Sequence, residues 1–193
     1  MELLEAIYSR RATRSYLPEP VSDETVRRLL EVAVQAPSAM NAQPWRFVVI
    51  QDTARLHRYS ERAKALLLQR MGGDDKSRHY AERLSSRGFN IFYDASTLVV
   101  ICGPAGGPYV QADCWVAAQN LQLAARALGL GTCCIGFAVP ALNDPEVKAE
   151  LDIPPDIAAI APLIVGTPRS APPPVPRAAP QILSWFRQPK GDQ

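Results

Sequence analysis

The sequence predicts an α+β protein in which a small sheet packs against several helices. Segments with apolar residues at helical spacing intermix with three short runs that are rich in β-branched residues. The strands are few and their connections vary in length, which argues against a regular doubly wound sheet. With 193 residues, of which 47% are hydrophobic and 21% charged, the chain suits one globular domain with an appended segment.

The N-terminal part predicts two helices joined by an extended segment. Residues 2–11 carry leucine and isoleucine at helical spacing, and Pro18 and Pro20 then favour an extended chain. Ser22 is a suitable N-cap for the second helix, because its hydroxyl can accept a bond from a free backbone amide of the first turn. This helix should end at Ala36, since a residue that precedes proline avoids the helical conformation.

The next part predicts a strand, a helix and a surface insertion. Residues 45–50, WRFVVI, form the short apolar run that is typical of a strand. Asp52 can cap a helix that runs to about Gln69. The segment 72–88 is polar and highly charged, so we interpret it as a surface insertion that is partly helical around residues 80–84.

The second half predicts two further strands and two helices. The strands cover residues 97–102 and 159–165, and the longest helix covers 110–128. That helix is rich in alanine and leucine and nearly uncharged, which indicates burial on most sides, in a core or at a subunit interface. Glycines in 129–131 should end it, and Asp144, followed by proline, should start a short helix.

The last segment, residues 166–193, is expected to form an arm. Its prolines favour an extended chain and cannot supply the regular hydrogen bonds of a central strand. We therefore expect one domain over residues 1–193, with an arm from residue 166 onward that wraps over another surface.

Charge and cysteine content exclude several classes of protein. The formal net charge is +2, from 21 basic and 19 acidic residues, which is too balanced to predict binding to nucleic acid or to a membrane. No segment looks like a secretory signal or a membrane helix. The four cysteines, Cys102, Cys114, Cys133 and Cys134, have neither metal-site nor disulfide spacing, so we expect buried thiols, no metal and a cytoplasmic location.

No catalytic nucleophile with a neighbouring base can be recognised. His57 and His79 lie in charged segments and are expected to be exposed, and none of the common hydrolase or metalloprotease motifs is present. If the protein is an enzyme, we expect a bound cofactor to carry the chemistry and no catalytic side chain.

The segment SRRATRS contains the sharpest charge cluster, formed by Arg10, Arg11 and Arg14. One interpretation is a solvated basic helix end, where cations suit the helix dipole. The other is an anion site, because the planar guanidinium donates two parallel charge-assisted hydrogen bonds to a phosphate.

Two other segments have alternative interpretations. APSAMNAQPW, residues 36–45, is either a solvent loop or a binding loop, since prolines fix its ends and Ser38, Asn41 and Gln43 offer polar groups. TCCIGF, residues 132–137, either passes close to a planar ring or forms a buried strand with a tight turn.

Taken together, these motifs resemble the nitroreductase family of FMN-dependent oxidoreductases. The resemblance rests on SRRATRSY, on PSAMNAQPWRFVVI, on DCWVAAQNLQLAARALGLGTCCIGF and on a VGTP strand end followed by a proline-rich tail with an arginine. It spans about residues 3–185. It implies a mixed or antiparallel sheet flanked by helices, in an intertwined homodimer with two flavin sites that both subunits build.

The resemblance also implies roles for individual residues. Arg10, Arg11 and Arg14, with Arg177 from the arm, would hold the FMN phosphate and ribityl chain. Ala12 stands where the family often has serine, so only its backbone amide would remain. A further set would lie against the flavin ring: Pro37, Ser38, Ala39, Met40, Asn41 and Gln43 from the partner subunit, and Cys134, Ile135 and Gly136 from the same one. Asn90, or alternatively Gln69, would approach the flavin pyrimidine.

The implied activity is a ping-pong reaction. NADH or NADPH would reduce FMN, and a nitroaromatic, quinone or enone would then take the hydride in the same shallow site, shaped by residues 66–92 and 103–109. An alternative is a flavin-binding protein for storage or sensing without reductase activity. In the family, a basic residue is common two positions before the arm arginine. Here that position is Val175, and this difference, together with Ala12 in place of serine, keeps the alternative of a flavin-binding protein open.

Overall fold

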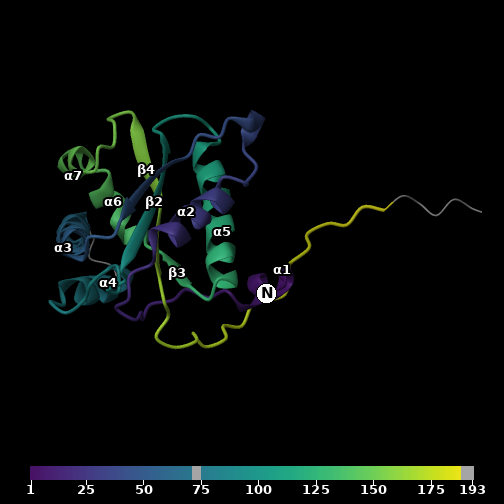
Figure 1. Cartoon of the computed structure of the whole chain (residues 1–193), viewed down its shortest axis with the longest axis horizontal. Helices are drawn as coiled ribbons and strands as arrows, with labels where there is room; N and C mark the ends of the chain where they lie inside the picture. Colours follow the sequence, from purple (N-terminus) through teal and green to yellow (C-terminus); the bar gives the residue numbers. More distant parts are fainter. Residues whose placement is uncertain (71–74, 188–193) are drawn as a thin grey trace, which may run out of the picture.

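The computed structural model describes residues 1–70 and 75–187, with side chains from residue 80 onward in the second range. Figure 1 shows a sheet in the middle of the molecule with helices on both of its faces. The strands follow the order β1-β2-β4-β3, and every neighbouring pair is antiparallel. This architecture confirms the predicted α+β class, and of the two expected forms of the sheet, mixed or antiparallel, the structure has the antiparallel one.

The sheet consists of β1 (Arg46–Ile50), β2 (Thr97–Pro104), β3 (Gly131–Cys134) and β4 (Ile157–Gly166). The two central strands, β2 and β4, are buried on both faces for most of their length. Helices cover both faces, so these strands consist of continuous apolar runs and lack a polar alternation. Successive side chains of β2 point to opposite faces of the sheet, so alternate residues pack into two separate hydrophobic cores, one on each face.

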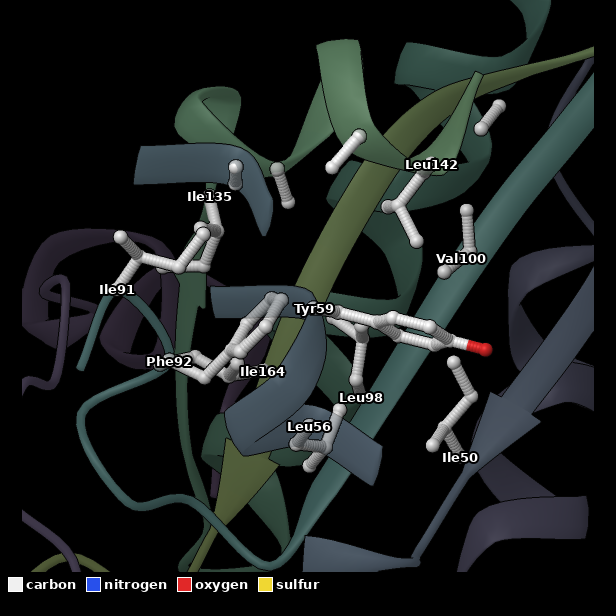
Figure 2. Close-up of a cluster of buried hydrophobic side chains, with 14 of the residues drawn as sticks. Ile50, Leu56, Tyr59, Ile91, Phe92, Leu98, Val100, Ile135, Leu142 and Ile164 are labelled. Atoms are coloured by element: carbon white, nitrogen blue, oxygen red, sulfur yellow. The ribbon is translucent and has the colours of Figure 1, made fainter. Parts of the chain in front are cut away.

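One face of the sheet is covered by α3 (Thr53–Arg70), α4 (Asp75–Ser85), α6 (Val139–Leu142) and α7 (Pro145–Glu150). Figure 2 shows the core on this side, where Leu98 and Val100 of β2 meet Leu56 and Tyr59 of α3. The Tyr59 hydroxyl leaves this core to donate a hydrogen bond of 2.9 Å to Glu150.

The opposite face is covered by α2 (Asp23–Ala33) and α5 (Val110–Ala127). Val99 and Ile101 of β2 pack there against Leu29 of α2 and Leu121 of α5. The short α1 (Leu3–Ser9) contacts α5, and two 3₁₀ turns, η1 (Ala39–Asn41) and η2 (Gly136–Ala138), complete the elements used below. No helix within the described ranges is long and apolar enough to cross a membrane.

The predicted helix starts are confirmed at three carboxylate or hydroxyl caps. Ser22 accepts from the amide of Thr25, and Asp52 accepts from the amide of Arg55 at 2.9 Å. Asp144 accepts from the amide of Glu146 at 3.1 Å. These local signals act within one helical turn, which is why the sequence alone reveals them.

Some element boundaries differ from the predictions. The first helix ends at Ser9 and not at residue 11, because Arg10 adopts an extended conformation that directs the chain toward β3. The insertion is helical over Asp75–Ser85, more than predicted, and its residues 72–74 lie outside the described part. The four-residue α6 was not predicted, since so short a helix has no periodicity to recognise.

Two apolar surfaces remain exposed. On α5, one face is buried but Trp115 and Val116 stay about half exposed, so burial on most sides is wrong for the single chain. The arm, residues 169–187, contains neither helix nor strand and runs away from the body (Figure 1). Its large apolar side chains are open to solvent, with Leu183 exposed to 98% and Phe186 to 94%.

Candidate functional site

The arginine segment lies directly beside β3. Ala12 forms a parallel bridge with Thr132, and the Thr13 amide donates a hydrogen bond of 2.9 Å to the Thr132 carbonyl. Gly131 makes this approach possible, because a Cβ at that position would stand only 2.5 Å from the Thr13 hydroxyl. The fold therefore joins two motifs that are about 120 positions apart in the sequence.

The three predicted arginines lie in this segment with little charge compensation. Within residues 1–70 and 75–187, none of Arg10, Arg11 and Arg14 forms an ion pair with a carboxylate. Arg10 donates to the Gln122 amide oxygen at 3.4 Å. Arg11 donates to the Tyr8 and Arg10 carbonyls, while its buried Nε has no partner in the described chain.

A first cavity of about 210 Å³ opens on one side of the segment. Arg126 of α5 also lines it and donates a hydrogen bond of 2.9 Å to the Ser9 hydroxyl. The lining comes from the arginine segment, the end of α5, β3 and the start of the arm: Ser9, Arg10, Arg11, Thr13, Arg126, Leu130, Gly131, Thr132, Pro168, Ser170, Ala171 and Pro172. It includes three arginines and no acidic residue, which favours an anion.

Arg126 was not predicted as a site residue. It is the only basic residue of α5, and this isolation in a nearly uncharged helix was the one available signal. Its approach to Arg10 depends on how α5 packs against α1, which the sequence does not reveal.

A second cavity, of about 410 Å³, opens beside Arg14 and the end of β3. Its walls are mostly aromatic or apolar, and its two charged side chains are both arginines. The lining residues come from α4, the segment after it, β3 and η2: Arg14, Tyr80, Arg83, Ile91, Tyr93, Cys133, Cys134, Ile135, Gly136 and Phe137. The predicted residues Cys134, Ile135 and Gly136 therefore gather here with Arg14.

The end of β3 presents backbone and thiol groups to the second cavity. Cys134 is exposed, so the expectation of four buried thiols is wrong for this one. Ile135 directs its side chain into the core (Figure 2), and its amide donates to the Pro162 carbonyl at 2.9 Å. The next residue, Gly136, begins η2 and lines the cavity, where first-turn amides lack acceptors within the helix.

Both thiols at this edge have a pKa above the ordinary value for cysteine. Burial raises the pKa of Cys133 above its ordinary value, and Arg14 and Arg10 oppose the rise. Desolvation also raises the pKa of Cys134, and nearby Cys133 adds to this, while Arg10 and a hydrogen bond with Gln122 oppose it. A reactive thiolate would need the reverse shift, so these cysteines do not look like nucleophiles.

The loop of residues 37–43 has a fixed and strained shape. Met40, Asn41 and Gln43 all have φ near +50°, a conformation that is uncommon for residues other than glycine. The Ser38 hydroxyl accepts from the Gln43 amide at 3.0 Å, and the Gln43 side chain donates to Asn41 at 3.1 Å. Strain of this kind persists only where the surrounding structure holds it, and it is frequent in binding sites.

Within one chain, this loop and the arginine segment lie at opposite ends of α5. The loop is tied to the first turn of α5, where the Asp113 carboxylate accepts from the Ala39 amide at 3.1 Å. Arg10 contacts Gln122, nine residues further along the helix, and at 1.5 Å per residue this corresponds to about 13 Å. Figure 1 shows α1 near the C-terminal end of α5, which it contacts.

The remaining predicted residues lie apart from the cavities. Asn90 is buried, and its side chain bonds Asp94 at 2.8 Å and the Phe92 amide at 2.9 Å. Its neighbours Ile91 and Tyr93 line the second cavity, whereas Asn90 does not. Gln69 is exposed on α3, and Arg177 is exposed in the arm. His57 is exposed as expected, and the side chain of His79 lies outside the described part.

Comparisons with known proteins match nearly the whole chain. The family model described as "Nitroreductase family" matches residues 7–167. A protein of Archaeoglobus fulgidus, provisionally named NADH dehydrogenase/NAD(P)H nitroreductase, is 32% identical over 174 residues, which cover 87% of this chain and 86% of that protein. The 5,6-dimethylbenzimidazole synthase of Rhodospirillum rubrum is 36% identical over 183 residues, covering 86% and 82%.

A solved structure extends the similarity to three dimensions. A nitroreductase with bound FMN from Bacteroides fragilis superposes with a TM-score of 0.82 at 26% sequence identity. The superposition covers 97% of this chain and 100% of that one.

Proposed function

The chain belongs to the nitroreductase family of flavin oxidoreductases, and on that premise we propose that it binds FMN and transfers hydride from NADH or NADPH to a nitroaromatic, quinone or enone. The observation that carries this proposal is the arginine segment. It forms no ion pair with an acid of the described chain, it is fixed against β3, and two cavities flank it. The relative named as a synthase indicates that membership of the family does not by itself define the acceptor.

The residues present fit an FMN molecule. The first cavity offers Arg10, Arg11 and Arg126 without an acid, and the unpartnered Nε of Arg11 is a buried donor that an anion would satisfy. Guanidinium groups match a phosphate through paired charge-assisted bonds. The second cavity offers Arg14, Tyr93 and the Gly136 backbone beside the thiols, as a flat polar-edged ring requires.

We assign the anchoring of the phosphate to Arg10, Arg11 and Arg126, with Arg177 brought in by the arm. The backbone of Ala12 lies between them. Arg14, Cys134, Ile135 and Gly136 line the position of the ring. Since the Ile135 amide is already bonded to Pro162, Gly136 is the better candidate for a backbone hydrogen bond to the ring. Asn90 remains a prediction, although its amide is bonded to its own turn.

FMN, when bound, would supply the hydride transfer itself, first from the nicotinamide and then to the acceptor. The chain then needs to bind, orient and exclude water, which agrees with the absence of a nucleophile–base pair from the sequence. Donor and acceptor would use the second cavity in turn, in a ping-pong sequence.

We also propose that the site is completed in a homodimer of single-domain chains. The loop of residues 37–43 is held about 13 Å along α5 from the Arg10 contact, and none of its residues lines either cavity of the same chain. A second copy can place its Pro37, Ser38, Ala39, Met40, Asn41 and Gln43 there. The exposed Trp115 and Val116 on α5 and the apolar arm supply surface for such an interface. The free cysteines suit the predicted cytoplasmic location.

The purified protein tests this function directly. We expect a yellow dimer that oxidises NADH or NADPH when a quinone or nitroaromatic is supplied, with parallel lines in double-reciprocal plots for a ping-pong reaction. A yellow protein that is inert to both nicotinamides would favour the storage or sensing role. A colourless protein that ignores added FMN would contradict both.

Arg10→Ala tests the phosphate site. Loss of one charge-assisted bond of about 1.5–3 kcal/mol should weaken FMN binding by roughly 10- to 150-fold, measured by quenching of flavin fluorescence. The melting temperature of the apoprotein should change little, because Arg10 is not in the core. Arg27→Ala, on the exposed face of α2, is the matched control. Equal FMN affinity in the two variants would place the phosphate elsewhere.

A further inference from the structure

Arg83 of α4 is held at the second cavity by aromatic side chains. Its Nη2 donates a hydrogen bond of 3.1 Å to the Tyr93 hydroxyl. Its guanidinium carbon lies 4.5 Å from the centre of the Phe89 ring and 5.7 Å from that of Tyr93. These contacts fix the side chain while leaving guanidinium donors that Tyr93 does not use.

Among the described residues, Arg83 has no acidic partner. In the part of the chain that the structure describes, Arg83 forms no ion pair, and the residues lining the second cavity include no carboxylate. Arg14 lines the same cavity and lies 6.0 Å from the Tyr93 ring centre, on the ring that Arg83 also contacts. A ligand in this cavity would therefore meet a positive field.

The rest of the cavity suits a planar ring. Tyr80 and Phe137 meet edge to face, with ring centres 5.7 Å apart and an angle of 82° between the planes. Ile91 and Ile135 add apolar surface. Tyr80 and Arg83 are three residues apart on α4, so one face of this helix contributes both an aromatic ring and a cation.

We propose that the second cavity selects planar aromatic ligands that carry an anionic group, of which a carboxylate is the simplest, and that Arg83 is the residue that selects them. This inference deepens the proposed function, because it defines the class of electron acceptor at that site. Arg14 is assigned to the flavin, which leaves Arg83 for the ligand. The guanidinium group of arginine binds a carboxylate through two parallel charge-assisted hydrogen bonds. A neutral amide has one acceptor oxygen and no charge, so arginine binds it more weakly.

The test compares two ligands of nearly equal shape, 4-nitrobenzoate and 4-nitrobenzamide. Their dissociation constants are measured by isothermal titration calorimetry on the purified full-length protein with its flavin and without nicotinamide. We expect wild-type protein to bind the carboxylate about tenfold more tightly, a moderate preference because Arg83 is solvent-exposed. Arg83→Ala should abolish the preference, Arg83→Lys should keep part of it, and Arg87→Ala, an exposed neighbour that does not line the cavity, should leave it unchanged.

The outcomes separate this inference from the proposed function. Equal binding of the two ligands to wild-type protein, or a preference that survives in Arg83→Ala, would overturn the inference even if the enzyme turns over. An Arg83→Ala variant that loses flavin or raises the KM for NADH, with the preference intact, would also overturn it. Loss of the preference for 4-nitrobenzoate in Arg83→Ala supports the inference. If the wild-type protein shows that preference but reduces no acceptor, the proposed reductase function fails and the inference stands.

Discussion

Gly131 shows how one missing side chain builds the candidate site. The Cβ and Cγ2 atoms of Thr13 would both lie 2.7 Å from a Cβ at this position, and Thr13 itself is buried. Thr13 therefore cannot move away without separating the arginine segment from β3. The glycine is needed for close approach and not for an unusual backbone conformation, since its φ is not in the left-handed region.

Gly131→Ala should therefore damage both stability and binding. We expect the free energy of unfolding to fall by about 1–3 kcal/mol, the range for an overpacked buried contact. FMN affinity should fall as well, because the arginines shift with Thr13. Denaturant unfolding and flavin titration measure the two effects. Gly106→Ala is the control, since a Cβ there would meet nothing within 4 Å, and an equal effect of both substitutions would contradict this account.

Single residues also show what the sequence could predict about the site. Arg10, Arg11 and Arg14 were recognisable because they form one local cluster of charge. Arg83 and Arg126 were not, because tertiary packing alone brings them to the cavities. Cys134 was predicted as buried from its apolar neighbours, but it is the last residue of β3 and lies open at the second cavity, whereas the three residues before it are buried.

At the scale of elements, α5 sets the spacing between the arginine segment and the loop of residues 37–43. Its first turn holds the loop of residues 37–43 through Asp113, and its last turns contact Arg10 and Ser9 through Gln122 and Arg126. The sequence predicted this helix from its composition and its C-terminal end from the glycines in 129–131, whereas its start carries no side-chain cap. The sequence does not reveal which other elements of the chain α5 packs against, because contacts between distant segments leave no periodic pattern in the sequence.

Asp113→Ala should release the loop from α5. The Ala39 amide would lose its acceptor, which costs about 1–3 kcal/mol where the group stays buried. We expect lower stability toward denaturant and weaker flavin binding by the dimer. Asp113→Asn keeps an acceptor oxygen and should restore most of both properties. Wild-type flavin affinity in Asp113→Ala would show that the loop does not serve the flavin site.

At the scale of the whole molecule, the arm and one face of α5 leave apolar side chains exposed in the single chain. The arm carries Ile182, Leu183, Trp185 and Phe186 into solvent, where their apolar area gains nothing for folding. The sequence predicted the extended form of the arm from its prolines. The expectation that the arm wraps over another surface stays a prediction, because in the single chain the large apolar side chains of its described residues stay exposed.

Deletion of residues 171–193 should weaken the dimer and leave the core of each chain folded. The two cores and the sheet lie before this point, so circular dichroism and the cooperativity of unfolding should be retained. Light scattering after size exclusion should show monomers at concentrations where the full chain is dimeric. A truncation that removes only residues 188–193 is the control. A truncated chain that stays dimeric at every concentration would show that the arm does not hold the dimer together.

The exposed arm links assembly to the lifetime of the protein. Proteases bind substrates as extended chains, and residues 169–187 already have this conformation, without helix or strand to unfold first. A chain without a partner therefore offers a cleavage site that its folded core does not protect. If the partner covers the arm, pairing hides this site, so that orphan chains are degraded while paired chains persist.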